Sequence, residues 1–330
     1  MCEKPKFVTV DVIKSSAGLT RFSRSGVVYL QDCEVDIDGE TELEKNKQLE
    51  LANITFKNCS VSIKNLKIQS EGFINGKSLE FISCGSVYIE NCNISCNNPG
   101  SDKAPYPNRQ NTSCCVYALN SDLNIKNSML EGSGLEVRGI IGDQSTVKIL
   151  ESTIKNTDNS GVWGRNKADI FLSKSQILGC GGYGAVYATN GATITVESCV
   201  QVDNPGGCGV FVLHEQSRVN LNNSSLSRNK WSGFGCRWSG GGTITNCNFD
   251  SNGQGAWAIR KSTIKDVTRR NNIVTNDFTD KNYEKVAFLF VDPLNTALGE
   301  KGLASRGLSV EKAKELREKE GGRRQNTKIK

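Results

Sequence analysis

The sequence predicts an all-β protein: a single-stranded parallel β-helix of about ten coils, followed by a short C-terminal helix and tail. One short motif recurs along the chain, from "VYLQDCEV" to "GTITNCNF". Within each copy, apolar residues alternate with polar ones, which is the period of a β-strand. A unit of about 24 residues accommodates three short strands separated by turns, which is one coil of a β-solenoid.

Each copy of the motif carries a small residue, Cys or Ser, between two apolar positions. These residues are Cys33, Cys59, Cys92, Ser128, Ser152, Ser175, Cys199, Ser224 and Cys247. From Ser128 onward the steps between them are 24, 23, 24, 25 and 23 residues, and the earlier steps of 33 and 36 indicate insertions. We expect this ladder to point inward at a tight bend, preceded by stacked Asn residues whose amides hydrogen-bond along the axis.

The ends of the chain lack the motif. A β-helix needs caps because its end coils expose strand edges. We therefore predict an N-terminal cap over 1–25, the β-helix over 26–265, a C-terminal cap over 266–300, and a helix with a basic tail over 301–330. In the last segment, "SVEKAKELREKE" (309–320) is typical of a helix with Ser309 as its N-cap.

The charge of the chain resides in its tail. The net charge is +6, and residues 301–330 hold ten Lys/Arg and four Glu, so the first 300 residues are neutral. A neutral body disfavours nucleic acid as a partner. No run of about 18 apolar residues exists, so no membrane span is expected. Thirteen cysteines without an apolar leader indicate reduced thiols in the cytoplasm.

A second strand in each coil follows a glycine-rich corner, as in "GLEVRG", "GVWGRN" and "GVFVLH". Aligning these strands places Phe211 and Leu213 in the core, with Val212 and His214 outside. The alignment predicts one outward stripe formed by Arg138, Arg165, Thr189, His214, Arg237 and Arg260, with Trp163 and Tyr187 beside it. Guanidinium groups suit carboxylate or sulfate, so the stripe is predicted to bind a protein or an acidic polysaccharide.

A plainer interpretation of the arginines stays open. Surface positions at strand ends are often basic, and stacked arginines can pair with loop carboxylates such as Asp143, Asp169 and Glu215. His214 is the chain's single histidine. In the predicted stripe it stands between Thr189 and Arg237, away from acidic side chains, which favours a ligand contact over a catalytic base.

The repeat resembles the right-handed parallel β-helix of the pectin-lyase-like superfamily over roughly residues 26–265. That superfamily includes lyases, epimerases and non-enzymatic repeats, so the resemblance implies the fold and leaves the function open. The leading hypothesis is a non-enzymatic binding or scaffold module. The alternative is a polysaccharide lyase or epimerase on uronates, with Arg165 or Arg237 neutralising the carboxylate and His214 or Tyr187 removing the C5 proton.

No cofactor or metal is predicted. The outward positions of the glycine-led strands supply only Glu136, whereas a calcium site needs several acidic groups. Cys92, Cys96, Cys114 and Cys115 are poor zinc ligands, because Cys92 belongs to the inward ladder and adjacent cysteines rarely share one metal.

Overall fold

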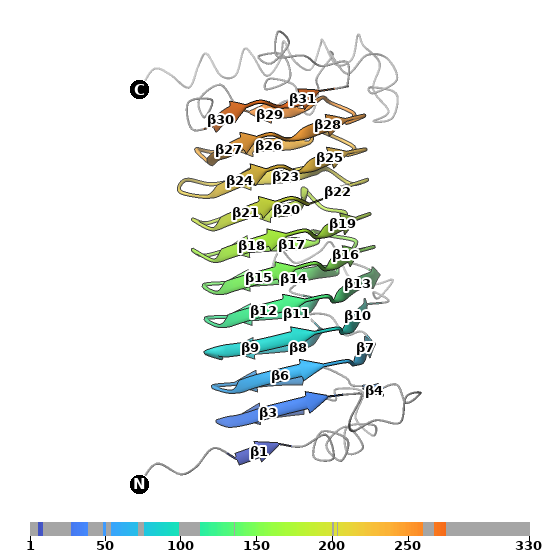
Figure 1. Cartoon of the computed structure of the whole chain (residues 1–330), viewed down its shortest axis with the longest axis vertical. Coiled ribbons are helices and arrows are strands. Elements are labelled where there is room, and N and C mark those ends of the chain that lie inside the picture. The colour runs from blue at the N-terminus through green and yellow to red at the C-terminus, as the bar shows by residue number, and fades with distance from the viewer. Residues whose placement is uncertain are drawn as a thin grey trace, which may run out of the picture.

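The structure is a computed structural model that describes residues 6–8, 28–38, 49–50, 54–71, 76–98, 113–134, 136–199, 201–202, 204–259 and 267–274. It is a right-handed parallel β-helix, which confirms the predicted fold class (Figure 1). The coil count, the caps and the domain bounds stay predictions, and residues 301–330 with their expected helix lie outside the described residues. The described part contains no helix, and hence none of the length and apolarity needed to cross a membrane.

Three parallel sheets of eleven, ten and ten strands form the walls, here named A, B and C. Sheet A contains β1 (Lys6–Val8), β3 (Cys33–Asp38), β6 (Ser60–Lys64), β9 (Ser86–Glu90), β12 (Asp122–Lys126), β15 (Thr146–Leu150), β18 (Asp169–Ser173), β21 (Thr193–Glu197), β24 (Arg218–Asn222), β27 (Gly241–Thr245) and β30 (Val267–Arg270). Sheet B contains β2 (Val28–Gln31), β5 (Ile54–Lys57), β8 (Lys77–Ile82), β11 (Cys114–Leu119), β14 (Arg138–Asp143), β17 (Val162–Arg165), β20 (Gly184–Ala188), β23 (Cys208–Leu213), β26 (Phe234–Arg237) and β29 (Trp257–Ile259). Sheet C contains β4 (Leu49–Glu50), β7 (Lys67–Glu71), β10 (Asn93–Asn98), β13 (Met129–Gly134), β16 (Thr153–Lys155), β19 (Gln176–Leu178), β22 (Gln201–Val202), β25 (Ser225–Ser227), β28 (Asn248–Asp250) and β31 (Ile273–Val274).

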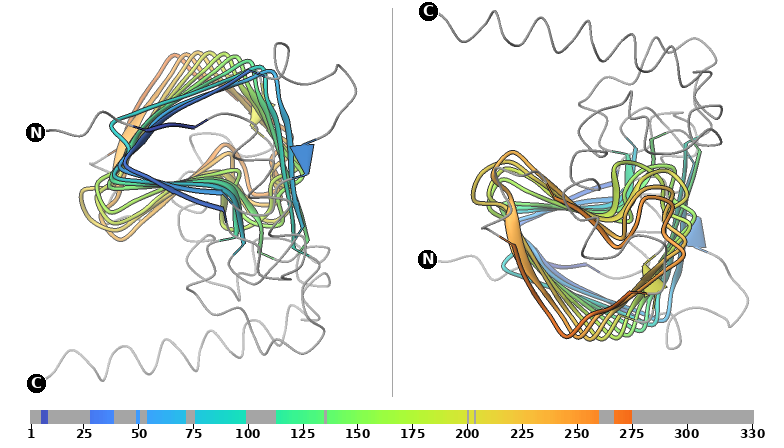
Figure 2. Two further views of the ribbon diagram at one scale, coloured as in Figure 1. Left: turned by 90° about the horizontal axis from the view of Figure 1, so that it is seen from below. Right: turned by 90° about the horizontal axis from the view of Figure 1, so that it is seen from above.

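Each coil passes through sheet B, then sheet A, then sheet C, and the next coil repeats the path directly above it (Figure 2). The alternating side chains of all three sheets fill the interior with Ile, Val, Leu and Phe. Equivalent core residues stack on one another, as the rings of Phe56 and Phe81 do at 5.1 Å between centroids. The core therefore runs the length of the solenoid as columns of like residues.

The corner between sheets A and C shows why the motif needs a small polar residue. At this corner Asn91 and Asn127 take left-handed backbone with φ of 53° and 47°. The next residue in each case, Cys92 or Ser128, is buried. The Ser128 Oγ accepts a hydrogen bond from the Cys92 N–H at 3.1 Å and donates to the Lys126 carbonyl at 2.7 Å. The hydroxyl at this corner therefore accepts a hydrogen bond from a buried backbone N–H that the pairing of the strands does not satisfy.

The predicted small-residue ladder proves to be two ladders at different corners. Cys59 turns the chain from sheet B into sheet A, the corner that Cys84 and Ser121 occupy in later coils. Cys92 and the later members turn it from sheet A into sheet C, and Leu66 holds that place in the coil of Cys59. The step of 33 residues between Cys59 and Cys92 therefore changes corner and marks no insertion. The side chain of Cys33 lies outside the described residues.

The cysteine rungs make the fold sensitive to alkali. Eleven cysteines of the described chain are buried. Burial raises the pKa of the Cys92 thiol and of the Cys199 thiol to about 11, against 9.0 for an exposed thiol. The folded value exceeds the unfolded one, so this contribution to stability is full below pH 9 and is lost as the pH rises toward 11.

We therefore expect the double variant Cys92→Ser, Cys199→Ser to lose less stability than the wild type between pH 9 and pH 11. The difference should reach a few kcal/mol, at roughly 1.4 kcal/mol per pKa unit for each thiol. Serine occupies the same rung in neighbouring coils at Ser128 and Ser175, so the substitutions suit the corner. Urea unfolding at pH 8 and pH 10.5 measures the effect, and parallel losses in both proteins would contradict it.

Candidate functional site

The outer face of sheet B carries a column of stacked aromatic rings. Trp163, Tyr187 and Phe211 are in register on β17, β20 and β23. Their ring centroids are 6.0 Å and 5.7 Å apart, with planes inclined by 16° and 20°. Each ring therefore turns its faces toward its neighbours along the axis, and the Tyr187 ring is stacked on both sides. We call these three residues the aromatic column.

Two further rings flank this column where the chain enters sheet B. Tyr183, just before β20, packs at a tilt against Tyr187 and Phe211 with centroids 6.4 and 6.1 Å away. It also lies 6.3 Å from the ring of Trp231, which precedes β26. Tyr183 is 59% exposed, whereas Phe211 is 2% exposed. The surface therefore presents one open tyrosine on a base of ordered rings.

The guanidinium of Arg165 belongs to a buried network below this column. Its Nε donates to Asp143 Oδ2 at 2.7 Å, and its Nη2 donates to the Tyr117 hydroxyl at 3.2 Å. The Tyr117 hydroxyl donates to the same carboxylate at 3.2 Å, and Asn166 Nδ2 donates to its other oxygen at 2.8 Å. The alternative that a strand-end arginine pairs with Asp143 is thus confirmed for Arg165, whose charge is neutralised.

Trp163 is held by cations and by a hydrogen bond. The guanidinium carbons of Arg138 and Arg165 each lie 4.9 Å from its ring centroid. Its indole Nε1 donates to the hydroxyl of Thr189 at 3.0 Å. Arg138 is itself 8% exposed and paired with Glu136 at 3.3 Å. The base of the aromatic column is therefore fixed in one geometry before any ligand arrives.

The predicted arginine stripe is wrong at two of its rungs. The strand-end residues Asp143 and Arg165 are in register, and so are Leu213 and Arg237, while Thr189 directly follows the end of β20 between them. Arg138 begins β14, where it pairs with Cys114, so Asp143 takes the rung expected for arginine. Leu213 takes the rung expected for His214. Arg260 lies outside the described residues.

The prediction for His214 was wrong because the alignment of β23 was shifted by one residue. Val210 and Val212 face the core, while Phe211 belongs to the aromatic column and Leu213 lies at the outer strand end, the reverse of the prediction. Because side chains alternate along a strand, a slip of one residue exchanges its two faces. The prediction for Arg138 was wrong because the alignment put "GLEVRG" inside the strand, whereas β14 begins at Arg138.

His214 lies in the turn after β23 with φ of 75°. Its ring stacks on Trp238 of the next coil at 5.4 Å, and Trp238 is 50% exposed. The Arg237 guanidinium lies 5.7 Å from the Trp238 ring. His214 thus belongs to the corner between sheets B and A and takes no part in the face that carries Tyr187.

The four residues named for uronate β-elimination are not gathered at one point. Arg165 and Arg237 lie on β17 and β26, separated by three strand steps, or about 14 Å at roughly 4.8 Å a step. Burial raises the pKa of the Tyr187 phenol, which keeps it protonated and unsuited to act as a base. Tyr187 is therefore disfavoured as the base, whereas His214 and Arg237 both lie against Trp238 and so stay together as one of the pairs named for this reaction.

The clustered cysteines are unsuited to metal binding. Cys96, Cys114 and Cys115 are all buried. Burial raises the pKa of the Cys115 thiol well above its usual value, and a metal needs the thiolate. Within the described ranges, no group of three or more His, Cys, Asp or Glu is placed to hold a metal ion.

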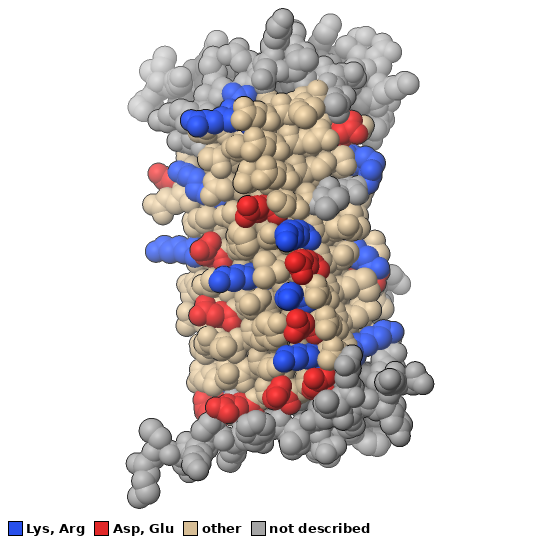
Figure 3. Space-filling view, viewed as in Figure 1, with Lys and Arg blue, Asp and Glu red and all other residues tan. Residues whose placement is uncertain are grey.

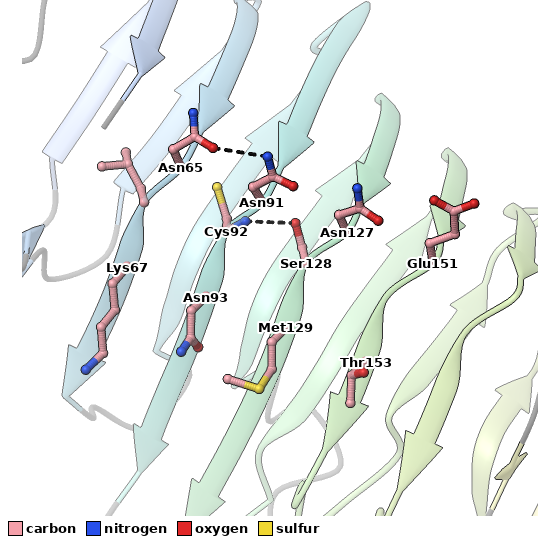
Figure 4. A pocket seen from close by; sticks show the side chains of 11 residues that line it. Asn65, Lys67, Asn91, Cys92, Asn93, Asn127, Ser128, Met129, Glu151 and Thr153 are labelled. Carbon is pink, nitrogen blue, oxygen red and sulfur yellow. Dashed lines mark hydrogen bonds between the residues drawn. The ribbon is translucent and has the colours of Figure 1, made fainter. Parts of the chain in front are cut away.

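An open, shallow groove with a volume of about 790 Å³, lined about equally by polar and apolar atoms, runs along the corner between sheets A and C (Figure 4). One wall consists of the corner residues Asn65, Asn91, Asn127 and Glu151. The other consists of Lys67, Asn93, Met129 and Thr153, which open β7, β10, β13 and β16. We call this feature the corner groove. The sequence motif indicated the corner wall, through the Asn residues that precede the small residue. It missed the other wall, because the residue that follows the small one was not aligned.

These features define a parallel β-helix with an aromatic face on one sheet and an open groove at one corner. Residues 114–278, half of the chain, match the family model described as the right handed beta helix region, and the chain belongs to that family. No curated protein matches it.

Two solved structures resemble the chain distantly. The first is the Azotobacter vinelandii mannuronan C-5 epimerase AlgE6 A-module, 11% identical over 81% of this chain and 95% of that one, with a TM-score of 0.29. The second is the AlgE4 A-module from the same organism, 11% identical over 81% and 93%, with a TM-score of 0.24. A similarity this distant carries no argument about activity.

Proposed function

We propose that this protein is a non-enzymatic binding module that holds a protein partner on the outer face of sheet B. The observation that carries the proposal is Tyr183, which is 59% exposed and rests on the ordered rings of Tyr187 and Phe211. Tyrosine, tryptophan and arginine are the residue types that dominate binding energy at protein interfaces. Rings fixed in advance lose little conformational entropy on binding, which favours affinity.

The geometry favours a protein over an acidic glycan at this face. Arg165 is neutralised by Asp143 and Arg138 is paired with Glu136, so neither offers an uncompensated charge to a polyanion. The faces of the Tyr187 ring are occupied by Trp163 and Phe211, which leaves no face for a sugar ring to stack on. The edges of such rings, and the rim of Tyr183, suit the mixed apolar and polar contacts of a protein.

The outer face of sheet A shows the same balance of charge. Lys64, Glu90 and Lys126 are in register on successive strands, and Lys126 lies 3.8 Å from Glu90. Blue and red side chains are intermixed over this face in Figure 3. An alternating column attracts no polyanion strongly, which supports the placing of nucleic acid below protein as a partner.

The proposal is tested with Tyr183→Ala. The control is Tyr29→Ala, because Tyr29 is similarly exposed, at 52%, but lies on β2 at the far end of sheet B, six strand steps or about 29 Å from β20. Partners captured by the wild type are identified by quantitative mass spectrometry, purified, and titrated against the three proteins. We expect Tyr183→Ala to weaken binding at least about tenfold, as truncation of a central interface tyrosine does, and Tyr29→Ala to leave it unchanged. Thermal unfolding should shift little in either variant.

Polyuronates and heparin are titrated in parallel. Binding of such an acidic glycan that is lost in Tyr183→Ala, without a protein that behaves in the same way, would replace the proposed partner class. Turnover of a polyuronate, seen as new unsaturated uronate absorbance or changed sugar configuration, would overturn the non-enzymatic assignment.

A further inference from the structure

We propose that the corner groove binds an uncharged, hydroxyl-rich chain of the neutral oligosaccharide class. The groove lies between sheets A and C, whereas the aromatic face belongs to sheet B, so the two sites are separate. Its walls extend over four coils, from Asn65 to Glu151, which is three steps or about 14 Å along the axis. This inference does not depend on the proposed protein partner.

The corner wall is an array of amides, part of which is held by the protein. Asn91 Nδ2 donates to Asn65 Oδ1 at 3.1 Å, and Asn65 Nδ2 donates to Asp38 Oδ1 at 2.8 Å. The series ends at Asn91. The side chain of Asn127, one coil further, makes no hydrogen bond with the residues described around it, and Figure 4 shows it between Asn91 and Glu151. Asn127 is exposed and therefore presents its amide donor and acceptor to solvent at the middle of the groove.

The second wall, formed by the first residues of the sheet C strands, also carries polar side chains. Asn93, Met129 and Thr153 are in register and half-buried. In the described part of the chain, neither the Asn93 amide nor the Thr153 hydroxyl has a protein partner for its hydrogen bonds. The apolar side chain of Met129 lies between them, opposite Asn127 (Figure 4). In this wall the polar side chains of Asn93 and Thr153 lie on either side of the flexible, apolar side chain of Met129. Such an arrangement suits a ligand that carries hydroxyl groups around an apolar ring.

The chemistry of the walls selects the ligand class. Amides and hydroxyls both donate and accept, as sugar hydroxyls do, so each can pair in either direction. The charged residues of the groove are one lysine and one glutamate at its opposite ends, Lys67 and Glu151, and Glu151 is shared with Lys174 at 3.9 Å. A polyanion or polycation would gain little there.

Local backbone geometry alone does not account for the groove. Left-handed backbone favours asparagine, which explains Asn65, Asn91 and Asn127 as corner residues. The preference of left-handed backbone for asparagine does not explain Asn93 and Thr153, which lie in regular strands on the other wall. The pairing of the two walls is therefore the observation that points to a ligand.

The test uses the full chain and four hexasaccharides, three neutral (glucose, mannose or xylose units) and one of galacturonate, titrated by calorimetry. The variants are Asn127→Asp, which keeps the shape and removes the amide donor, and Thr153→Val, which removes the hydroxyl at equal volume. Their matched controls are Asn223→Asp at the same corner above the groove and Thr195→Val on the outer face of sheet A.

We expect one neutral hexasaccharide to bind, and each groove variant to weaken it about 3- to 10-fold, the effect of one lost hydrogen bond. The two controls and Tyr183→Ala should bind it as the wild type does, which separates this site from the aromatic face. The proposal is overturned if no neutral hexasaccharide binds, if galacturonate binds better, or if binding survives both groove variants unchanged.

Discussion

Replacement of Asp143 by alanine is expected to lower the free energy of unfolding by about 3–5 kcal/mol. The carboxylate is 5% exposed and accepts hydrogen bonds from Arg165, Tyr117 and Asn166. Its removal leaves the guanidinium of Arg165 without its counter-charge in a site that water reaches poorly. Urea unfolding at pH 7 measures the loss, and binding at the aromatic face should weaken with it because Arg165 also supports Trp163.

The control for this variant is Asp169→Ala, an exposed aspartate at the start of β18, expected to change stability by less than about 0.5 kcal/mol. A double-mutant cycle with Arg165→Ala isolates the pair, and the double variant should lose less than the sum of the single losses. Additive losses, or a loss below about 1 kcal/mol for Asp143→Ala, would show that the network contributes little to stability.

Replacement of Phe81 by alanine should cost about 3–5 kcal/mol, because the ring is fully buried and stacked on Phe56. In a solenoid each coil is held by its two neighbours, so a cavity on β8 weakens the contacts of β8 with both β5 and β11. Thermal and urea unfolding measure the cost.

Phe171→Ala is the matched control, since Phe171 lies on the outer face of sheet A and is only half-buried. It should cost less than about 1.5 kcal/mol. Similar losses in Phe81→Ala and Phe171→Ala would contradict the assignment of Phe81 to the continuous core.

The fold was open to prediction because its unit is local. Alternation in "VKILESTI" and "IFLSKSQI" marks β15 and β18, and the even spacing of Ser152 and Ser175 places them in successive coils. Each coil contacts chiefly the coils above and below it, so a short window of sequence contains most of what determines it.

The register of sheet B was less accessible, and the signal that decides it is steric. Gly139, Gly161, Gly209 and Gly233 occupy one equivalent position at the start of the sheet B strands, directly before the residues paired as Ile140, Val162, Val210 and Phe234. A Cβ at Gly139 would lie 2.4 Å from Ile154, and one at Gly233 would lie 2.4 Å from Phe249. This position must be small because inward side chains of sheet C press against it. Alignment on this glycine would have placed His214 beyond the strand end.

The candidate sites depend on contacts between coils. Asp143 precedes Arg165 by 22 residues and Thr189 follows Trp163 by 26, so these pairs form only after the coils stack. The corner groove likewise joins the ends of sheet A to the starts of sheet C over four coils. Residue types alone indicated aromatic and basic groups. They did not show that Arg138 and Arg165 are paired with carboxylates or that the rings are stacked on one another.

The sequence by itself determined the class of fold, the strand period and the spacing of the coils, because these follow from alternation and repeat length within one unit. Only the tertiary structure decided which face each side chain takes, which charges are cancelled and where two walls form a groove. Those outcomes depend on the register between coils, and a shift of one residue exchanges inside for outside while leaving the repeat itself unchanged.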